Sequence, residues 1–408
     1  MKLRLCSSIF FTMLAGTGIV PLAHAGTGRF VGSCTTKTPH YATITEAVAG
    51  AGDGDTIFVC PGRYSEQITI TRPLTLLGVA SGNASGAVLV SPPTGLVINA
   101  PGAGIAAQIA VMANGPVNLG NLTVDGADIP SVNGQPFEQT CNAVSSLAGI
   151  YYNQTPGSIQ HVETRNYSGF NGCAGGIYLD TGHLRQGSVT VEYSTIHDYE
   201  NYGVLAAGPA NLRNNYVLLG RVKTQSEGST SLGTTSGGTI TNNFVDMNHA
   251  PAYSDGITTF TDQTQSVGTP LIEGNIVERG QVGIDVFLTG NQVKNNTLID
   301  NVLGLVVSDD SSTGNTITDN FFVSANLIAT GNYVRSGRPI GAELNCVPGN
   351  TFSGNTFFGL GIGMNDIAPT EDFSSTNNFY EVSRKQAGCI KANVPPASQP
   401  QTSLGELQ

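Results

Sequence analysis

The chain has no tryptophan, and only 12% of its 408 residues are charged. Together with 52 glycines and many Asn, Thr and Ser residues, this composition argues against a helical bundle and favours a turn-rich, all-β protein. The apolar fraction of 39% is enough for a real hydrophobic core. General disorder is therefore excluded.

Beyond residue 25 the sequence lacks any run of 18 apolar residues, which argues against a membrane-spanning helix in the mature chain. Residues 1–25 themselves have the pattern of a secretory signal. Lys2 and Arg4 precede an apolar stretch, and a small-residue cleavage pattern ends at Ala25. We therefore expect a secreted or periplasmic protein, monomeric, that begins near Gly26.

Basic residues are scarce. Without Lys2 and Arg4, 16 of the 18 Lys and Arg side chains remain against 29 Asp and Glu, a balance of −13 with histidine neutral. Nucleic acid is not an expected partner, because it binds to basic surfaces.

No Cys-x-x-Cys pair occurs, so a zinc site is the weaker explanation for the cysteines. An even number of cysteines in an exported chain favours disulfides instead, with about 15 possible connectivities for six. We predict sequential pairing, because each pair brackets one unit of the chain: Cys34 with Cys60, Cys141 with Cys173, and Cys346 with Cys389.

A glycine followed by a short apolar run recurs along the chain, at Gly149, Gly176, Gly203, Gly256, Gly283, Gly304, Gly341 and Gly361. Such self-similarity predicts a solenoid whose units bury their apolar faces only against their neighbours. The interval from Gly203 to Gly256 is close to two units, so we predict a hidden unit near residues 220–225. Strand alternation predicts that Ile284 and Leu305 stack in the interior.

A second motif between these strands supplies a recurring asparagine, at Asn215, Asn243, Asn275, Asn296, Asn320 and Asn355. Asparagine tolerates the left-handed turn conformation, and stacked amides can bond one another along an axis. We therefore expect a row of amides at these six positions, each in the left-handed conformation.

These repeats, and the N-terminal segment at residues 41–79, resemble the right-handed parallel β-helix proteins of the pectate-lyase-like superfamily. The resemblance covers roughly residues 40–380. It implies an all-β fold, a single-stranded right-handed parallel β-helix (solenoid) with a short N-terminal capping helix over "ITEAVAGA". We expect the signal at 1–25, the β-helix domain at 26–395 and a flexible tail at 396–408. Residues 126–146 and 221–238 are expected to be projecting loops.

In that superfamily a polysaccharide lies across the outer face of the glycine-led strands. Carrying this geometry over, we expect aromatic rings on that face to bind sugars, since ring faces contact C–H surfaces. The alternative is that these ladders only stabilise neighbouring strands. The candidate substrate-binding residues are Tyr151, Tyr178, Tyr253, Phe260 and Phe287.

The stretch "YLDTGHLRQG" brings Asp180, His183 and Arg185 together at the end of one such strand. A lyase needs a base, and positive charge or calcium on the carboxylate of a uronate. We hypothesise that these three residues line one groove with Asp255 and Asp285 and form the catalytic set, with calcium as the cofactor that a lyase would use. Polar loop residues without a function are the alternative.

An alternative carboxylate pair is Asp246 and Glu278, which share one outward position on adjacent coils. A short separation would suit a retaining glycosidase and would raise one pKa. A structural role is the other explanation, because the superfamily does not use this face.

The tripeptide at Ser254–Gly256 is similar to one in polygalacturonases, but no Gly-His-Gly or Arg-Ile-Lys follows it. The motifs of pectin methylesterases cannot be placed beyond the N-terminal segment. Copper binding is disfavoured because three methionines and five histidines of the mature chain form no cluster. We therefore expect an exported carbohydrate-active protein, a polysaccharide lyase or glycoside hydrolase, or alternatively a non-catalytic glycan-binding or surface scaffold.

Overall fold

The computed structural model describes residues 27–37, 39–80, 86–136, 139–168, 172–182, 187–220, 228–235, 237–248, 254–260, 269–308, 312–324 and 338–389. The expected signal at 1–25 and tail at 396–408 lie outside these residues.

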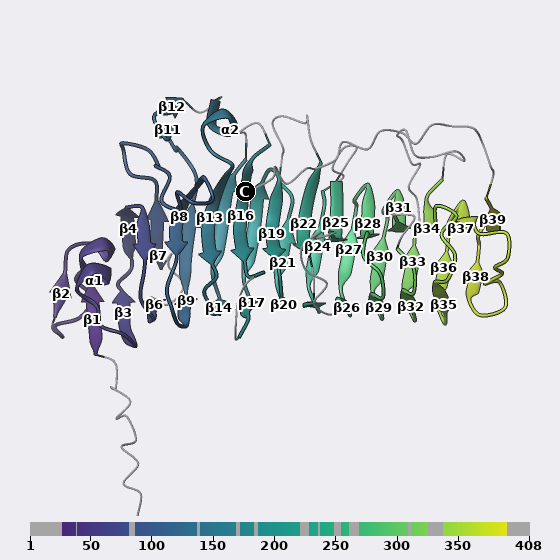
Figure 1. The fold of residues 1–408 in the computed structure, drawn as a ribbon, viewed down its shortest axis with the longest axis horizontal. Coiled ribbons are helices and arrows are strands. Elements are labelled where there is room, and N and C mark those ends of the chain that lie inside the picture. The colour runs from purple at the N-terminus through teal and green to yellow at the C-terminus, as the bar shows by residue number, and fades with distance from the viewer. Residues whose placement is uncertain are drawn as a thin grey trace, which may run out of the picture.

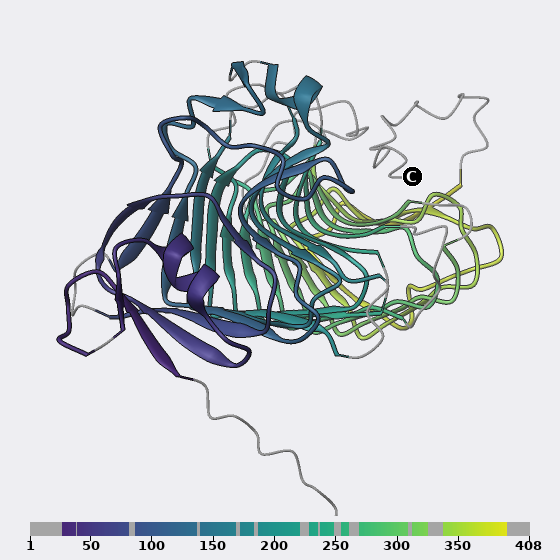
Figure 2. The ribbon, with the colours of Figure 1, turned by 60° about the vertical axis from the view of Figure 1, so that its left-hand side comes forward.

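The described chain winds repeatedly round one axis and forms an elongated parallel β-helix (Figures 1 and 2). Each coil contributes one short strand to each of three long sheets, in the order sheet C, sheet A, sheet B. Neighbouring coils pair in parallel, as in Ile284 with Leu305. The predicted all-β solenoid is confirmed.

Sheet A has 13 strands: β2 His40–Tyr41, β1 Gly28–Val31, β3 Asp55–Val59, β6 Leu74–Gly78, β9 Val117–Gly120, β14 Gly157–Gln160, β17 Val189–Glu192, β20 Ala210–Arg213, β23 Thr239–Thr241, β26 Leu271–Glu273, β29 Gln292–Lys294, β32 Thr316–Thr318 and β35 Thr351–Ser353. Sheet B has 12: β38 Asn378–Tyr380, β36 Thr356–Phe358, β33 Phe321–Val323, β30 Thr297–Ile299, β27 Ile276–Glu278, β24 Phe244–Asp246, β21 Tyr216–Leu218, β18 Thr195–Tyr199, β15 Glu163–Tyr167, β10 Leu122–Asp125, β7 Ala87–Val90 and β4 Gly62–Ser65. Sheet C also has 12: β39 Arg384–Gly388, β37 Ile362–Ile367, β34 Ile340–Glu343, β31 Leu303–Val307, β28 Val282–Val286, β25 Ser254–Thr259, β22 Ser229–Thr234, β19 Tyr202–Ala207, β16 Ala174–Asp180, β13 Ser146–Asn153, β8 Ile105–Val111 and β5 Ile68–Ile70.

The predicted capping helix is α1, Ile44–Gly50. Thr43 and Glu46 form a reciprocal capping box that satisfies free amides at its start. Ile44, Ala47 and Val48 are buried and cover the first coil of the core. Helix α1 therefore closes the N-terminal end, which would otherwise expose apolar side chains to water.

Residues 126–146 depart from the solenoid as predicted. They contain a two-stranded hairpin, β11 Ser131–Val132 with β12 Gln135–Pro136, and a short helix α2, Thr140–Ala143. Figure 1 shows these elements standing out from the β-helix beside β8, β13 and β16.

The glycines of the sheet C strands are required by close backbone approach. A Cβ atom on Gly304 would lie 2.5 Å from the Gly341 carbonyl oxygen and 2.6 Å from the Phe322 ring. The same clash with the next coil recurs at Gly256, Gly283 and Gly341. The glycine also interrupts the alternation of side chains, so the residue just before it faces outward. None of these four glycines has a positive φ.

The hidden unit is present, but it lies later than predicted. It is β22, Ser229–Thr234, inside the segment predicted to be a loop at 221–238. Ser231 stands where both neighbouring coils have glycine, Gly203 and Gly256, and a Cβ on Gly203 would meet the Ser231 carbonyl oxygen at 2.5 Å. The glycine-led pattern therefore could not reveal this coil.

The apolar residues of "ITITRPLTLLGV" alternate along the sequence, but the segment does not form one continuous strand. It forms β5 in sheet C and β6 in sheet A, with Arg72 and Pro73 turning the chain between them. Proline lacks the amide that a central strand position would need.

The predicted amide row is present and extends one coil further. Each side-chain amide donates to the side-chain oxygen of the next, from Asn215 to Asn377, at 2.9–3.0 Å. The conformational part of the prediction is wrong: the left-handed residue precedes each of the six predicted asparagines, as Asn295 (φ 57°) precedes Asn296. The ladder asparagines are buried, so their side-chain amides form the hydrogen bonds with the backbone of the turn that water cannot reach to form.

A second, shorter amide row was missed. The Asn291 side-chain amide donates to the Asn315 side-chain oxygen at 2.8 Å. The Asn315 backbone N–H donates to the Asn350 side-chain oxygen at 3.0 Å. The signal in the sequence is a glycine directly before each of them, at residues 290, 314 and 349.

We expect Asn296→Ala to lower the free energy of unfolding by about 2 to 3 kcal/mol, because buried polar groups lose their partners. The Asn296 side chain bonds the Ile272 carbonyl at 3.0 Å and accepts from the Asn275 amide at 2.9 Å. Thermal unfolding followed by circular dichroism measures the change. The control is Asn295→Gly, since glycine tolerates the left-handed conformation there. Equal losses in both variants would contradict a role for the ladder.

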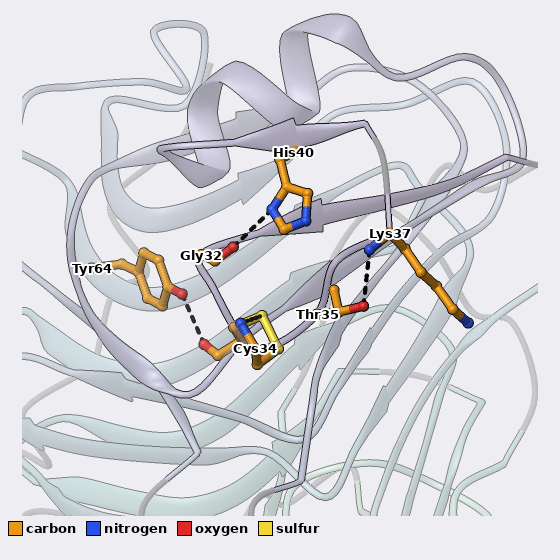
Figure 3. The surroundings of a disulfide bond; sticks show 7 residues. Gly32, Cys34, Thr35, Lys37, His40 and Tyr64 are labelled. Atoms are coloured by element: carbon orange, nitrogen blue, oxygen red, sulfur yellow. Dashed lines mark hydrogen bonds between the residues drawn. A yellow bond between two sulfur atoms is a disulfide. The ribbon is translucent and has the colours of Figure 1, made fainter.

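The three sequential disulfides are confirmed: Cys34–Cys60, Cys141–Cys173 and Cys346–Cys389. Because all six sulfur atoms are paired, the alternative of a zinc site on these cysteines is wrong. Figure 3 shows the first disulfide, beside which the Tyr64 hydroxyl donates to the Cys60 carbonyl at 2.8 Å. The second disulfide joins α2 to the segment before β16, and the third joins the residue after β39 to the turn that follows β34, two coils earlier.

Candidate functional site

The outer face of sheet C carries two rows of side chains, one on each side of the glycine. The row beyond the glycine runs through Tyr151, Tyr178, Leu205, Gly233, Thr258, Asp285, Val306, Glu343 and Asn365. The row before it runs through Tyr202, Thr230, Asp255, Val282, Leu303, Ile340 and Ile362. The face changes from aromatic to acidic to aliphatic along the axis.

Asp255 and Asp285 lie on adjacent coils in the middle of this face. Thr258 is directly opposite Asp285, and its hydroxyl lies 3.5 Å from the Asp255 carboxylate. The Ser308 hydroxyl, on the following coil, donates to the Asp285 carboxylate. Asp255 is partly exposed, whereas Asp285 is buried. Asp255 is therefore the member of the pair that a bound molecule would reach.

The fold favours the protonated form of both carboxyl groups. Loss of contact with water raises the pKa of Asp255 to about 7. Burial, and then repulsion by the neighbouring Asp255 charge, raise the pKa of Asp285 well above its ordinary range. Two coupled acids of this kind titrate as a pair, and the pair keeps a proton at a pH at which ordinary aspartates are ionised.

Asp180 ends β16, three coils before β25. At one coil per about 4.8 Å it lies about 14 Å along the axis from Asp255. The single groove hypothesised for Asp180, Asp255 and Asp285 is therefore wrong, because only the last two are on neighbouring coils. His183, Arg185 and Tyr253 lie outside the described residues.

Tyr151 and Tyr178 are on adjacent coils as expected, with ring centroids 5.4 Å apart. Their rings are covered, with 0% and 6% of each residue exposed, and they pack with Leu205 and Tyr202 in one cluster. The prediction of open sugar-binding platforms is wrong for these two, since the outward row is closed over by packing. Phe260 packs against this cluster, and its ring lies over Gly233, whereas Phe287 is partly exposed.

Asp246 and Glu278 share one register position on adjacent coils, as expected. Arg279 binds both: its guanidinium donates to each carboxylate oxygen of Asp246, and its Nε lies 3.4 Å from Glu278. Asp246 is also buried. The arginine neutralises this pair, so the contacts fit the structural alternative better than an acid–base role.

A third titratable cluster lies on the outer face of sheet B. The His197 imidazole bonds Glu163 at 3.0 Å and Asp198 at 2.7 Å, and Arg165 bonds Glu163 at 3.1 Å. The bond from His197 is the main reason that the pKa of Glu163 falls to about 2. Because every charge in the cluster is paired, we assign it to stability.

Within the described ranges, no group of three or more His, Cys, Asp or Glu side chains is arranged to hold a metal ion. No helix in the same ranges is both long and apolar enough to span a membrane.

Comparisons with known proteins agree with this architecture. Residues 148–322 match the family model described as a right handed beta helix region. A search of curated proteins finds no match to the chain. The chain thus has the right-handed parallel β-helix fold, and its resemblance to the pectate-lyase-like superfamily is confirmed at the level of the fold.

Among solved structures, DFA-IIIase from Arthrobacter chlorophenolicus A6 without its lid is 14% identical, with a TM-score of 0.50 and 84% of each chain covered. The A-module of the Azotobacter vinelandii mannuronan C-5 epimerase is 14% identical, with a TM-score of 0.49, and covers 85% of this chain and 93% of its own. Pectin methylesterase from Erwinia chrysanthemi is 16% identical, with a TM-score of 0.44, over 64% of this chain and 80% of its own. At these identities the comparison extends to the fold only.

Proposed function

We propose that this protein is an exported carbohydrate-active enzyme that hydrolyses glycosidic bonds on the outer face of sheet C. The observation that carries the proposal is the Asp255 and Asp285 pair, two coupled carboxyl groups with raised pKa values on adjacent coils. Pairs of this kind are typical of acid–base sites, because general acids work best with a pKa near the working pH.

The proton retained by the pair would be delivered from Asp255 to the glycosidic oxygen as the bond to the anomeric carbon breaks. A water oxygen then bonds to that carbon, and the carboxylate left behind accepts the water proton. One water is consumed and the pair returns to its starting state. Hydrogen bonds from Thr258 and Ser308 support the carboxylate form between the two steps.

Charge favours a hydrolase over a lyase here. Strands β22, β25, β28 and β31 carry no lysine or arginine. A lyase acting on a uronate must neutralise the carboxylate of its substrate, and two aspartates would repel it instead. We therefore propose a neutral polysaccharide as the substrate.

The alternative function is glycan binding without catalysis. The covered aromatic row at Tyr151 and Tyr178 argues against catalysis on a long substrate, because that part of the face is closed. Three disulfides support export in either case, since such bonds persist in oxidising compartments.

Incubation of the protein with xylan, mixed-linkage glucan, galactomannan, pectin and alginate tests the proposal. We expect new reducing ends from a neutral glycan, no absorbance at 235 nm, and a loss of about 10³-fold in kcat for Asp255→Asn, the scale of general acid–base catalysis. Unsaturated product would establish a lyase instead. Binding without any product would establish the non-catalytic alternative.

A further inference from the structure

The turns from sheet A to sheet B contain an anomaly. From β9 onward, each of these turns has a residue in the left-handed conformation, which side chains other than glycine, asparagine and aspartate rarely tolerate. Most of these positions follow the rule: Asn121, Asn214, Asn242, Gly274, Asn295, Asp319 and Gly354. His161 (φ 53°) and Tyr193 (φ 51°), on adjacent coils, do not. Backbone strain that persists in a fold is often found at functional sites.

These two exceptions form a stacked pair on the surface. The His161 and Tyr193 ring centroids are 5.4 Å apart with the ring planes inclined at 14°. Tyr193 is 54% exposed. The ring pair is therefore held open to solvent instead of contributing to the core.

A second stacked pair lies beside the first. The Tyr216 amide donates to the Ser194 carbonyl at 2.9 Å, and Tyr216 is opposite Thr195, so this pair begins one coil on from Tyr193 and two residues further round the coil. The Tyr216 and Phe244 rings are 5.2 Å apart and parallel to within 1°, and Tyr216 is 41% exposed. Strands β18, β21 and β24 are consecutive in sheet B, and β21 and β24 lie side by side in Figure 1. We call His161, Tyr193, Tyr216 and Phe244 the aromatic strip.

Polar groups fixed in place lie beside the strip. Glu192 accepts from Gln160 at 2.7 Å and from the Arg213 Nε at 2.6 Å. These residues immediately precede the left-handed positions of their turns, and the Arg213 side chain is half exposed. The charges of Glu192 and Arg213 compensate each other, so the row offers oriented hydrogen-bonding groups without a net charge.

We propose that the aromatic strip is a second glycan-binding site, which takes a neutral polysaccharide chain running along the β-helix axis. Coils repeat every 4.8 Å or about that distance, close to the length of one sugar residue in an extended chain. Rings then meet the C–H surfaces of the sugars, while the exposed Gln160 and Arg213 side chains, both held by the buried Glu192, meet their hydroxyl groups. The class of ligand rests on the proposed function, but the site lies on sheet B and does not use Asp255 or Asp285.

Affinity electrophoresis in gels containing xylan, mixed-linkage glucan or galactomannan tests the site, with alginate and polygalacturonate gels for comparison. The starting protein carries Asp255→Asn, so binding is measured without cleavage. We expect Tyr193→Asn and Tyr216→Ala each to weaken binding to a neutral glycan at least tenfold. Tyr380→Ala is the matched control, since Tyr380 is 55% exposed on the same sheet but away from the strip. It should retain full affinity.

Tyr193→Asn supplies a second measurement, because asparagine fits the left-handed turn that tyrosine strains. Its melting temperature should equal or exceed that of the starting protein while binding is lost, which separates a binding role from a structural one. Unchanged affinity in the Tyr193→Asn and Tyr216→Ala double variant would overturn the inference, as would stronger binding to uronates than to neutral glycans. Failure of the wild-type protein to cleave any glycan would reject the proposed hydrolysis and leave this result intact.

Discussion

Asp285→Asn is expected to make the protein more stable at pH 8 while abolishing hydrolysis. The pKa of Asp285 is raised in the fold, so the folded protein binds a proton that the unfolded chain has already lost. The resulting stabilisation is fully present below the pKa of an aspartate in the unfolded chain, about 3.9. It is lost as the pH rises through the pKa of Asp285 in the folded protein. Above the unfolded pKa the folded protein must either keep this proton or hold a buried charge beside Asp255, and both cost free energy. The neutral side chain of the Asp285→Asn variant should therefore raise the free energy of unfolding at pH 8 by about 2 kcal/mol.

Thermal unfolding at pH 4 and pH 8 measures this effect. The variant should melt several degrees higher than the wild type at pH 8 and at nearly the same temperature at pH 4. Asp246→Asn is the control of opposite sign, because it breaks the ion pair with Arg279 and should lower the melting temperature at pH 8. Equal melting of wild type and Asp285→Asn at both pH values would show that the two carboxyl groups are not coupled, and the acid–base proposal would lose its foundation.

Gly304→Ala is expected to cost about 3 kcal/mol of stability, at the upper end for overpacking a well-filled core. The added methyl group would lie 2.5 Å from the Gly341 carbonyl oxygen, which is backbone and cannot move aside without distorting the next coil. The Phe322 ring lies 2.6 Å from the added methyl group and cannot move away either. It stacks on Phe357 in the interior of the β-helix, with ring centroids 4.6 Å apart. Because each coil is stabilised by packing against its neighbours, the loss of packing should extend to adjacent coils along the axis.

Circular dichroism and limited proteolysis compare this variant with Gly102→Ala, where no atom lies within 4 Å of the added carbon. The control should melt within about one degree of the wild type, as surface substitutions usually do. Should Gly304→Ala prove insoluble, Ser231→Gly offers the reverse test. It replaces Ser231 with the residue that both neighbouring coils have, Gly203 and Gly256. Normal stability of Gly304→Ala would contradict the close approach of adjacent coils.

The repeats were readable in the sequence because stacking imposes the same demands on each coil. Ile284 and Leu305 could be paired correctly since both follow a glycine and both must fill the interior. The amide row from Asn215 to Asn355 was equally visible, because a buried turn must satisfy its backbone groups in the same way at every level. The conformation within that turn was not, since a dipeptide such as Asn295-Asn296 contains two candidates for the left-handed position.

The candidate site was readable only in part. Asp285 could be placed on the outer face by register, but its distance from Asp180 depends on a coil whose Ser231 hides the pattern. The burial of Tyr151 and Tyr178 was not predictable, because alternation assigns a side chain to a face and says nothing about what covers that face. The strained pair at His161 and Tyr193 gave no signal, since it breaks the turn rule that the other coils obey.

By itself, the sequence determined that this chain is an all-β solenoid, which faces of its strands are buried, and how its six cysteines pair. Those features follow from local periodicity, which each coil repeats. Only the tertiary structure decided which charged groups are compensated and which are left close together. Arg279 neutralises Asp246, while the Asp255 and Asp285 pair has no cation on its own or adjacent strands. Electrostatic interactions depend on distance and burial in space, and residues far apart in sequence set both.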